Sequence, residues 1–128
     1  MGDLTNNFSS SEFACPCCGK SEMDPQFMDR LQALRSEYGD TILIAKGGGF
    51  RCENYDTSNS AHKEGKAADL LYPRRNHYRL LQLAFKHGFT GIGDKNKNGY
   101  FQLHVDTADD IPNVRPRPLK WTYNTKGD

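Results

Sequence analysis

The sequence predicts an α+β fold in which a small antiparallel sheet packs against two helices. Two segments repeat apolar residues at helical spacing, and three short runs have the composition or alternation of β-strands. The last run alternates polar and apolar residues, as a strand does when only one face of its sheet is buried. With 128 residues the chain is long enough for one hydrophobic core. We therefore expect residues 1–128 to form a single domain.

Both predicted helices have recognisable ends. The first begins after Asp24, a favourable N-cap residue, with Pro25 in the first turn. Its apolar residues recur at helical spacing: Phe27, Leu31, Leu34 and Tyr38. Gly39 then ends the helix, since glycine readily adopts the left-handed conformation found at helix C-termini. The second helix is predicted over residues 76–87 and ends before Gly88.

The first two predicted strands flank glycine-rich or small-residue segments. Residues 41–45 form a short β-rich run that stops at three glycines, which predicts a buried strand followed by a flexible loop. Residues 65–71 form the next strand, between the two helices. The tail over residues 112–128 is rich in proline and basic residues. We expect it to wrap the core, with Trp121 as its one large anchor.

The last strand, over residues 100–106, has the clearest alternation. Its polar side chains share one face: Tyr100, Gln102, His104 and Asp106. The residues between them are apolar and would face the core. This strand therefore predicts a polar sheet surface backed by hydrophobic packing.

Composition and charge restrict the kinds of partner. The chain has 17 basic and 16 acidic side chains, a formal net charge of +1, so no strong field attracts nucleic acid or an anionic membrane. No apolar run approaches the roughly 20 residues needed to cross a bilayer. The first residues, MGDLTNNFSS, lack the pattern of a secretory signal. We expect a soluble monomer, cytoplasmic at synthesis, that binds neither nucleic acid nor membrane.

A polar motif with metal-ligand spacing lies between the predicted helices. Residues 60–69 read Ser-x-His-x-x-Gly-x-Ala-x-Asp and contain His62 and Asp69. A catalytic zinc needs three ligands of the His or carboxylate kind and one open position for water. His104, on the polar face of the last strand, would be the third ligand. The sequence thus predicts one zinc ion bound by these three residues.

With this motif the sequence resembles the zinc D-alanyl-D-alanine peptidases, peptidase family M15. That family includes bacterial carboxypeptidases, murein endopeptidases and phage endolysins, and shares its fold with the signalling domain of Hedgehog proteins. The resemblance implies a Hedgehog/DD-peptidase-like fold and zinc ligands at His62, Asp69 and His104. It also implies zinc-dependent hydrolysis of peptide bonds in peptidoglycan stem peptides or cross-links. A phage endolysin, released to the cell wall after synthesis, is the expected setting.

Arg51 is the expected substrate-binding residue. The family has a Ser-Gly-Tyr-Arg element ahead of the zinc motif, and the matching residues 48–51 read Gly-Gly-Phe-Arg. The arginine is present although the serine and tyrosine are not. A guanidinium can hold a peptide carboxylate or the oxyanion that develops at the attacked carbonyl.

The general base is the least clear of the expected catalytic groups. Several relatives have an acidic residue three positions before the last zinc histidine, or a second histidine two before it. This chain has Phe101 and Gln102 there, and Gln102 is kept as a catalytic candidate because it shares the face of His104. Asp106, on the same face, would act as base through a water or would orient a ligand, and we favour the orienting role.

The missing base leaves two other classes of function open. A catalytically inactive, zinc-stabilised module that binds the cell wall or a protein would keep the fold and the metal. A cysteine hydrolase using Cys52 is the third possibility, but no local nucleophile signature supports it.

Residues 94–99 also match the opening of a calcium loop. Asp94, Asn96 and Asn98 offer oxygen ligands on alternate residues, and a glycine follows. The twelfth position is Val105 rather than glutamate, however, and only one carboxylate is present. An Asn-Gly hairpin turn between two strands explains the same residues and is the favoured interpretation.

The four cysteines are Cys15, Cys17, Cys18 and Cys52. The segment Cys-Pro-Cys-Cys-Gly contains the spacing of a zinc knuckle, but a structural zinc site needs a second ligand pair. We therefore favour packed thiols, or a disulfide involving Cys52, over a second zinc ion. Similar Cys-rich segments occur near the N-terminus of some relatives.

Overall fold

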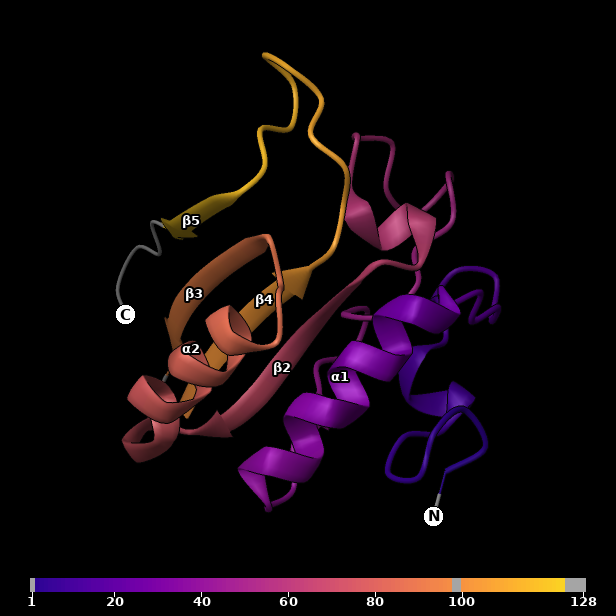
Figure 1. Cartoon of the computed structure of the whole chain (residues 1–128). Coiled ribbons are helices and arrows are strands. Elements are labelled where there is room, and N and C mark those ends of the chain that lie inside the picture. Colours follow the sequence, from indigo (N-terminus) through magenta and orange to yellow (C-terminus); the bar gives the residue numbers. More distant parts are fainter. Residues whose placement is uncertain (1, 98–99, 124–128) are drawn as a thin grey trace.

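The computed structural model describes residues 2–97 and 100–123, and its centre is a five-stranded sheet (Figure 1). The strands are β1 (Leu43–Ile44), β2 (Ala67–Pro73), β3 (Gly91–Lys97), β4 (Tyr100–Asp106) and β5 (Leu119–Thr122). They lie in the order β1-β2-β4-β3-β5, and all neighbouring pairs are antiparallel except β3 and β5. The sheet is thus mixed rather than antiparallel, because the C-terminal tail adds a parallel strand instead of only wrapping the core.

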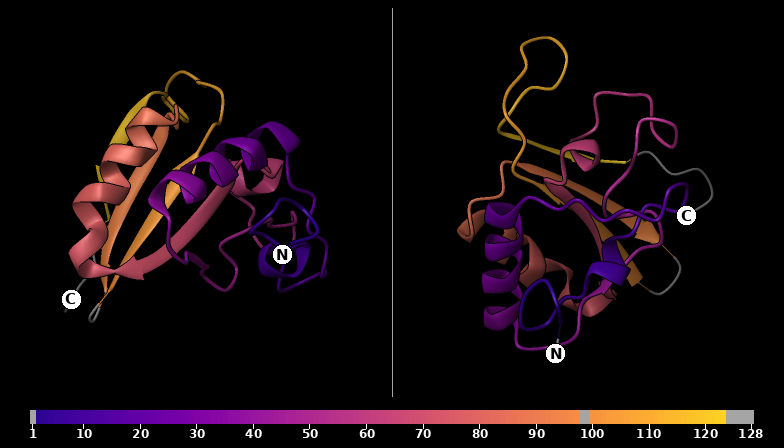
Figure 2. Two further views of the ribbon diagram at one scale, coloured as in Figure 1. Left: turned by 60° about the horizontal axis from the view of Figure 1, so that its bottom comes forward. Right: turned by 90° about the vertical axis from the view of Figure 1, so that its right-hand side faces the viewer.

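Two helices, α1 (Pro25–Tyr38) and α2 (His77–Lys86), cover one face of this sheet (Figures 1 and 2). The Asp24 carboxylate caps α1 by accepting a 2.9 Å hydrogen bond from the Phe27 N–H. Gly39 ends α1 with φ of 78°. Both predicted helices are confirmed, although α2 is preceded by a 3₁₀ turn, Arg74–Asn76. None of the helices among the described residues is long and apolar enough to span a membrane.

The register of the sheet separates its two faces. Helix-facing residues of the three central strands belong to the buried core: Ala68, Leu70, Tyr72, Ile92, Leu103 and Val105. On the other face Asp69 of β2 lies directly opposite His104 of β4, and Gly93 of β3 lies on the other side of His104. The alternation predicted for residues 100–106 is therefore confirmed, and polar residues gather on the face that the helices leave uncovered.

The segment before α1 packs on the core mainly through two aromatic side chains. Phe8 and Phe13 are buried and meet edge to face with ring centroids 5.8 Å apart. The Phe50 N–H donates a 2.9 Å hydrogen bond to the Phe13 carbonyl. This contact brings the N-terminal segment beside the loop that follows β1.

Candidate metal centre

Three elements bring His62, Asp69 and His104 together. His62 lies on a 3₁₀ turn, η2 (Ala61–Glu64), whose N-cap Ser60 accepts a hydrogen bond from the His62 N–H. Gly65 ends that turn with φ of 70°. The chain then enters β2, in which Asp69 lies on the face that the helices leave uncovered. The exposed fractions of the three residues are only 2%, 6% and 6%.

The ligand atoms of these three residues form a nearly equilateral triangle. His62 Nε2 lies 3.2 Å from His104 Nδ1 and 3.4 Å from Asp69 Oδ1, and the latter two atoms are 3.2 Å apart. Ligands at about 2.0–2.1 Å from a tetrahedral zinc ion are separated by about 3.3–3.4 Å. The triangle therefore has the size of one face of a zinc coordination tetrahedron, and the residues fit this metal.

Hydrogen bonds on the far side of each imidazole determine which nitrogen is available. His62 Nδ1 lies 2.8 Å from the Gly49 carbonyl, which can only accept, so Nδ1 is the protonated nitrogen and Nε2 has a free lone pair. His104 Nε2 lies 2.6 Å from Asp106 Oδ2 and donates to it, which leaves Nδ1 for a metal. Both free nitrogens are the ones that form the triangle.

Arg51 orients the third ligand. Its Nη2 donates to Asp69 Oδ2 at 3.2 Å, which leaves Oδ1 directed at the two histidines. Its Nε and Nη1 donate to the Gly47 carbonyl and to Asp56, at 2.8 and 3.1 Å. Among residues 2–97 and 100–123, three of the five N–H groups have acceptors, and the other two have none there and could contact a ligand. The contact with Asp69 is one that the sequence did not predict.

Charges around the triangle keep Asp69 ionised. Burial alone would raise the pKa of the Asp69 carboxyl, but the hydrogen bonds from His104 and His62 outweigh it and lower the pKa. For His104 burial favours the neutral ring, whereas the hydrogen bonds with Asp106 and Asp69 raise its pKa.

The contacts of Asp106 suit the orienting role better than that of a base. It is fully buried, and Oδ2 accepts from His104 and from Arg117 Nη2 at 2.6 and 2.7 Å. Oδ1 accepts from Arg117 Nε and the Ala108 N–H at 2.9 and 3.1 Å. Burial opposes ionisation, but His104 and Arg117 lower the pKa of this carboxyl. Both carboxylate oxygens of Asp106 already accept hydrogen bonds and neither reaches solvent, so this residue is poorly placed to take a proton from water.

Arg117 and Trp121 belong to the site although the sequence pattern did not identify them as site residues. The parallel pairing of β5 puts Trp121 opposite Gly93, where a Cβ atom would collide with the indole ring. The rings of Trp121 and His104 have centroids 5.4 Å apart, and the Arg117 guanidinium lies 5.2 Å above the indole. The tail thus covers one side of the candidate ligands.

A cleft of about 340 Å³ opens beside His104. Its lining consists of residues 58–61, His104, Val114, Arg115, Arg117, Trp121 and Tyr123. No carboxylate is among these lining residues, which come from the described part of the chain. Gln102 is half-buried on the same strand face as His104 but makes no hydrogen bond to the three ligand side chains.

The residues proposed for calcium do not form a cation site in the described chain. Asp94 is on the helix-facing side, where Oδ1 accepts from Lys120 and Thr122 at 3.0 and 2.6 Å and Oδ2 contacts His77 at 3.1 Å. These partners occupy the carboxylate that calcium would need. Asn96 lies on the same regular strand, β3, and Asn98 lies outside the described residues. The structure therefore gives calcium no support and shows a β3–β4 strand pair instead.

Comparison with known proteins agrees with this geometry. The sequence model of the family described as Peptidase M15 matches residues 6–106, most of the chain. The matched region includes His62, Asp69, His104 and Asp106, whereas Arg117 and Trp121 follow it. No curated protein matches the chain.

Proposed function

The chain belongs to the peptidase M15 family and is a peptidase, and from this premise we propose that it is a zinc metallopeptidase of the bacterial cell wall. Its substrates would be peptide bonds in peptidoglycan stem peptides or cross-links, cleaved as a carboxypeptidase or an endopeptidase. The observation that carries the proposal is the triangle of ligand atoms, with edges of 3.2, 3.2 and 3.4 Å. Residues 1–128 would act as one zinc peptidase domain and as a monomer.

The three ligands and their hydrogen-bond partners would have different roles. His62 Nε2, Asp69 Oδ1 and His104 Nδ1 would bind the metal, while Arg51 and Asp106 hold two of these groups in position. When bound, zinc supplies a Lewis acid for the scissile carbonyl and lowers the pKa of water to near 7. The three ligand atoms already lie close enough together to hold one ion.

The cleft beside His104 would receive the peptide. Arg115 and Arg117 line it, each already paired with a carboxylate, Glu64 or Asp106, so they would offer a stem peptide N–H donors rather than an unpaired positive charge. Burial and the charge of Asp69 raise the pKa of the Tyr123 hydroxyl, against a hydrogen bond with Trp121 that lowers it. Tyr123 therefore remains protonated at neutral pH and can donate a hydrogen bond to a developing oxyanion.

Gln102 and Arg51 would contribute binding rather than proton transfer. An amide has no proton to take up at neutral pH, so Gln102 is a candidate for substrate contact and not for the base. Arg51 has two N–H groups left for a substrate carboxylate or carbonyl after its contacts with Asp69, Asp56 and Gly47. A phage endolysin that reaches the wall after release from the cell is the setting that we propose.

One observation favours a second candidate function. The cleft has no carboxylate among its described lining residues, so a zinc-stabilised binding module that has lost turnover is the alternative. Such a module would bind isolated peptidoglycan without changing it.

The experiment that separates the two is hydrolysis of isolated peptidoglycan by the purified protein. We expect new free amine termini to appear, to disappear with a chelator, and to return when zinc is added. A His62→Ala variant should release none. Mass analysis of the digested muropeptides would identify the bond cut. Binding to peptidoglycan with no chelator-sensitive amine termini would contradict the peptidase proposal and leave the binding module.

A further inference from the structure

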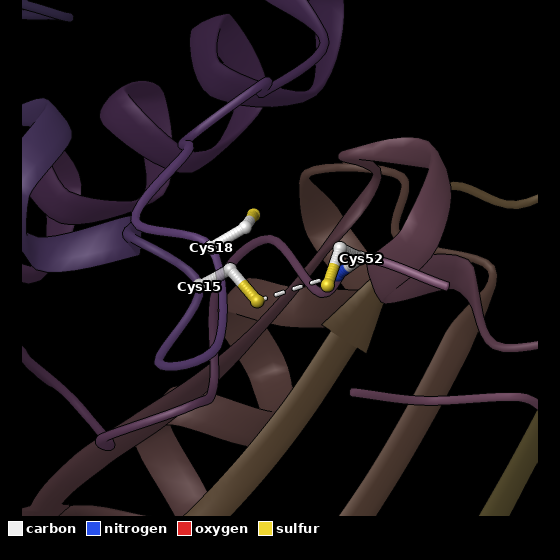
Figure 3. A group of neighbouring side chains, drawn as sticks. All are labelled: Cys15, Cys18 and Cys52. Atoms are coloured by element: carbon white, nitrogen blue, oxygen red, sulfur yellow. Dashed lines mark hydrogen bonds between the residues drawn. The ribbon is translucent and has the colours of Figure 1, made fainter. Parts of the chain in front are cut away.

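A second group of potential metal ligands lies away from the histidines and Asp69. Cys15 and Cys18 belong to the turn that precedes α1, and Cys52 follows Arg51 in the loop after β1. One sulfur atom from each lies within 4.8 Å of the other two. Figure 3 shows the Cys15 sulfur pointing toward Cys52 across the gap between the two segments. The structure has all the cysteines as free thiols.

The turn around Cys15 has the backbone geometry that favours a bound thiolate. The Gly19 N–H donates to the Cys15 carbonyl at 2.8 Å, and Gly19 has φ of 77°, so the chain folds back around the sulfur. The Cys52 N–H donates to Cys15 Sγ at 3.4 Å, and the backbone N–H groups of Cys18 and Cys17 also point at it. Burial opposes ionisation, but these N–H groups lower the pKa of the Cys15 thiol to about 6.

Neighbouring thiols oppose the ionisation of Cys17 and Cys18. The Cys52 thiol raises the pKa of Cys17, both by hydrogen bonding and by charge. A hydrogen bond from the Lys20 backbone lowers the pKa of Cys18, but burial and the thiols of Cys15 and Cys52 outweigh it, so this pKa is also raised. Several thiolates this close repel one another, and a divalent cation removes that repulsion.

We propose that Cys15, Cys18 and Cys52 bind a second, structural zinc ion, with Cys17 as its fourth ligand. Thiolates are soft ligands that select zinc, and a structural zinc site is closed by four protein ligands. The first three sulfurs are already grouped, and the exposed Cys17 interacts with the thiol of Cys52. The ion would tie the N-terminal segment to the loop of Arg51, whose guanidinium holds Asp69.

Zinc content tests the proposal, and each site serves as a control for the other. Protein purified under reducing conditions should contain about two zinc ions per chain, and His62→Ala and Cys18→Ser about one each. Glu22→Gln, which removes a carboxylate from the cavity beside Cys18 and Cys52, should keep about two. A Cys18→Ser protein with the zinc content of the unmodified protein would overturn the proposal.

Cobalt substitution gives a readout that depends only on sulfur ligands. The cobalt-loaded His62→Ala variant should show intense thiolate-to-metal absorption in the near ultraviolet, since it keeps every cysteine. This variant tests metal binding by the cysteines even where the Cys18→Ser protein does not fold. No such absorption, or a mass lower by two hydrogens that reveals a disulfide, would overturn the second site. Because peptidoglycan hydrolysis depends on the other site, failure here and failure of the proposed peptidase are distinguishable.

Discussion

The two groups of candidate metal ligands are built in opposite ways. Asp69 and His104 project from paired strands, and each is held by a charged partner, Arg51 or Asp106. Cys15 and Cys18 instead lie in a turn outside regular structure, with Cys18 exposed, and are held mainly by backbone N–H groups. The sheet therefore organises its ligands before a metal binds, whereas zinc in the cysteine group would itself organise the loops. Loss of a ligand from the His62, Asp69 and His104 group should lower the rate of hydrolysis. Loss of a cysteine ligand should instead lower the stability of the fold.

Removing a ligand from the sheet site should have the largest effect on activity. We expect His62→Ala to lower kcat/KM for peptidoglycan hydrolysis by on the order of 10³-fold or more, because the Lewis acid contributes several kcal/mol. His87→Ala is a matched control and should keep full activity, since the imidazole of His87 hydrogen-bonds Glu37 and is not one of the candidate ligands. Comparable losses in both variants would show that His62 has no special role.

Removing the charged partner of His104 should have the next largest effect. Asp106→Asn should weaken zinc binding by about 10- to 100-fold, because the His104 ring loses the group that selects its tautomer. Competition with a chromophoric chelator would measure this. Asp109→Asn, a change at a nearby exposed carboxylate, should leave zinc affinity as it is. Equal affinities for Asp106→Asn and the unmodified protein would contradict the orienting role.

Shortening the aromatic side chain of β5 should affect substrate binding more than the metal. Trp121→Leu should raise KM by about tenfold with a smaller change in kcat, because the indole lines the cleft but contacts the metal ligands only through His104. Leu119→Ala on the same strand lies outside the cleft and should leave KM near its original value. Unequal zinc content between Trp121→Leu and the unmodified protein would instead place Trp121 among the residues that support the metal.

The smallest effect concerns Asp56, whose salt bridge with Arg51 lies between the two groups of ligands. Burial opposes ionisation, but hydrogen bonds from Ser58 and from Arg51 lower the pKa of Asp56 to about 2. Because this pKa lies below the ordinary value of about 3.9, the contribution to stability is complete above about pH 4 and is lost as the pH falls toward about 2. Asp56→Asn should cost about 1 kcal/mol in the free energy of unfolding at about pH 7, after allowance for solvent screening.

Denaturant unfolding of both proteins at several pH values would measure this difference. The two stabilities should converge as the pH drops from about 4 to about 2. A difference that stays constant over this range would show that Asp56 acts by packing rather than by charge.

The sequence indicated the three candidate zinc ligands because their positions follow from local patterns. The motif over residues 60–69 and the alternation around His104 identified all three. Arg117 and Trp121 could not be placed, because the parallel pairing of β5 with β3 depends on a long connection that has no periodic pattern. The approach of Cys52 to Cys15 is likewise a contact between loops distant in sequence. Local periodicity predicts strands and helices, but it does not predict which loops meet.

Helix boundaries show the same limit on a smaller scale. The cap residues of α1 were visible in the sequence, and its limits agree with the structure. The start of α2 moved to His77, because Asn76 ends a 3₁₀ turn and its side chain makes no cap hydrogen bond. Capping residues fix a boundary only where their side chains are used.

Zinc bound by His62, Asp69 and His104 is the central claim, and anomalous diffraction from crystals of the zinc-loaded protein tests it directly. We predict a zinc peak at about 2.0–2.2 Å from His62 Nε2, His104 Nδ1 and Asp69 Oδ1. A peak bound through His104 Nε2, or no peak among these side chains in protein that hydrolyses peptidoglycan, would contradict this assignment.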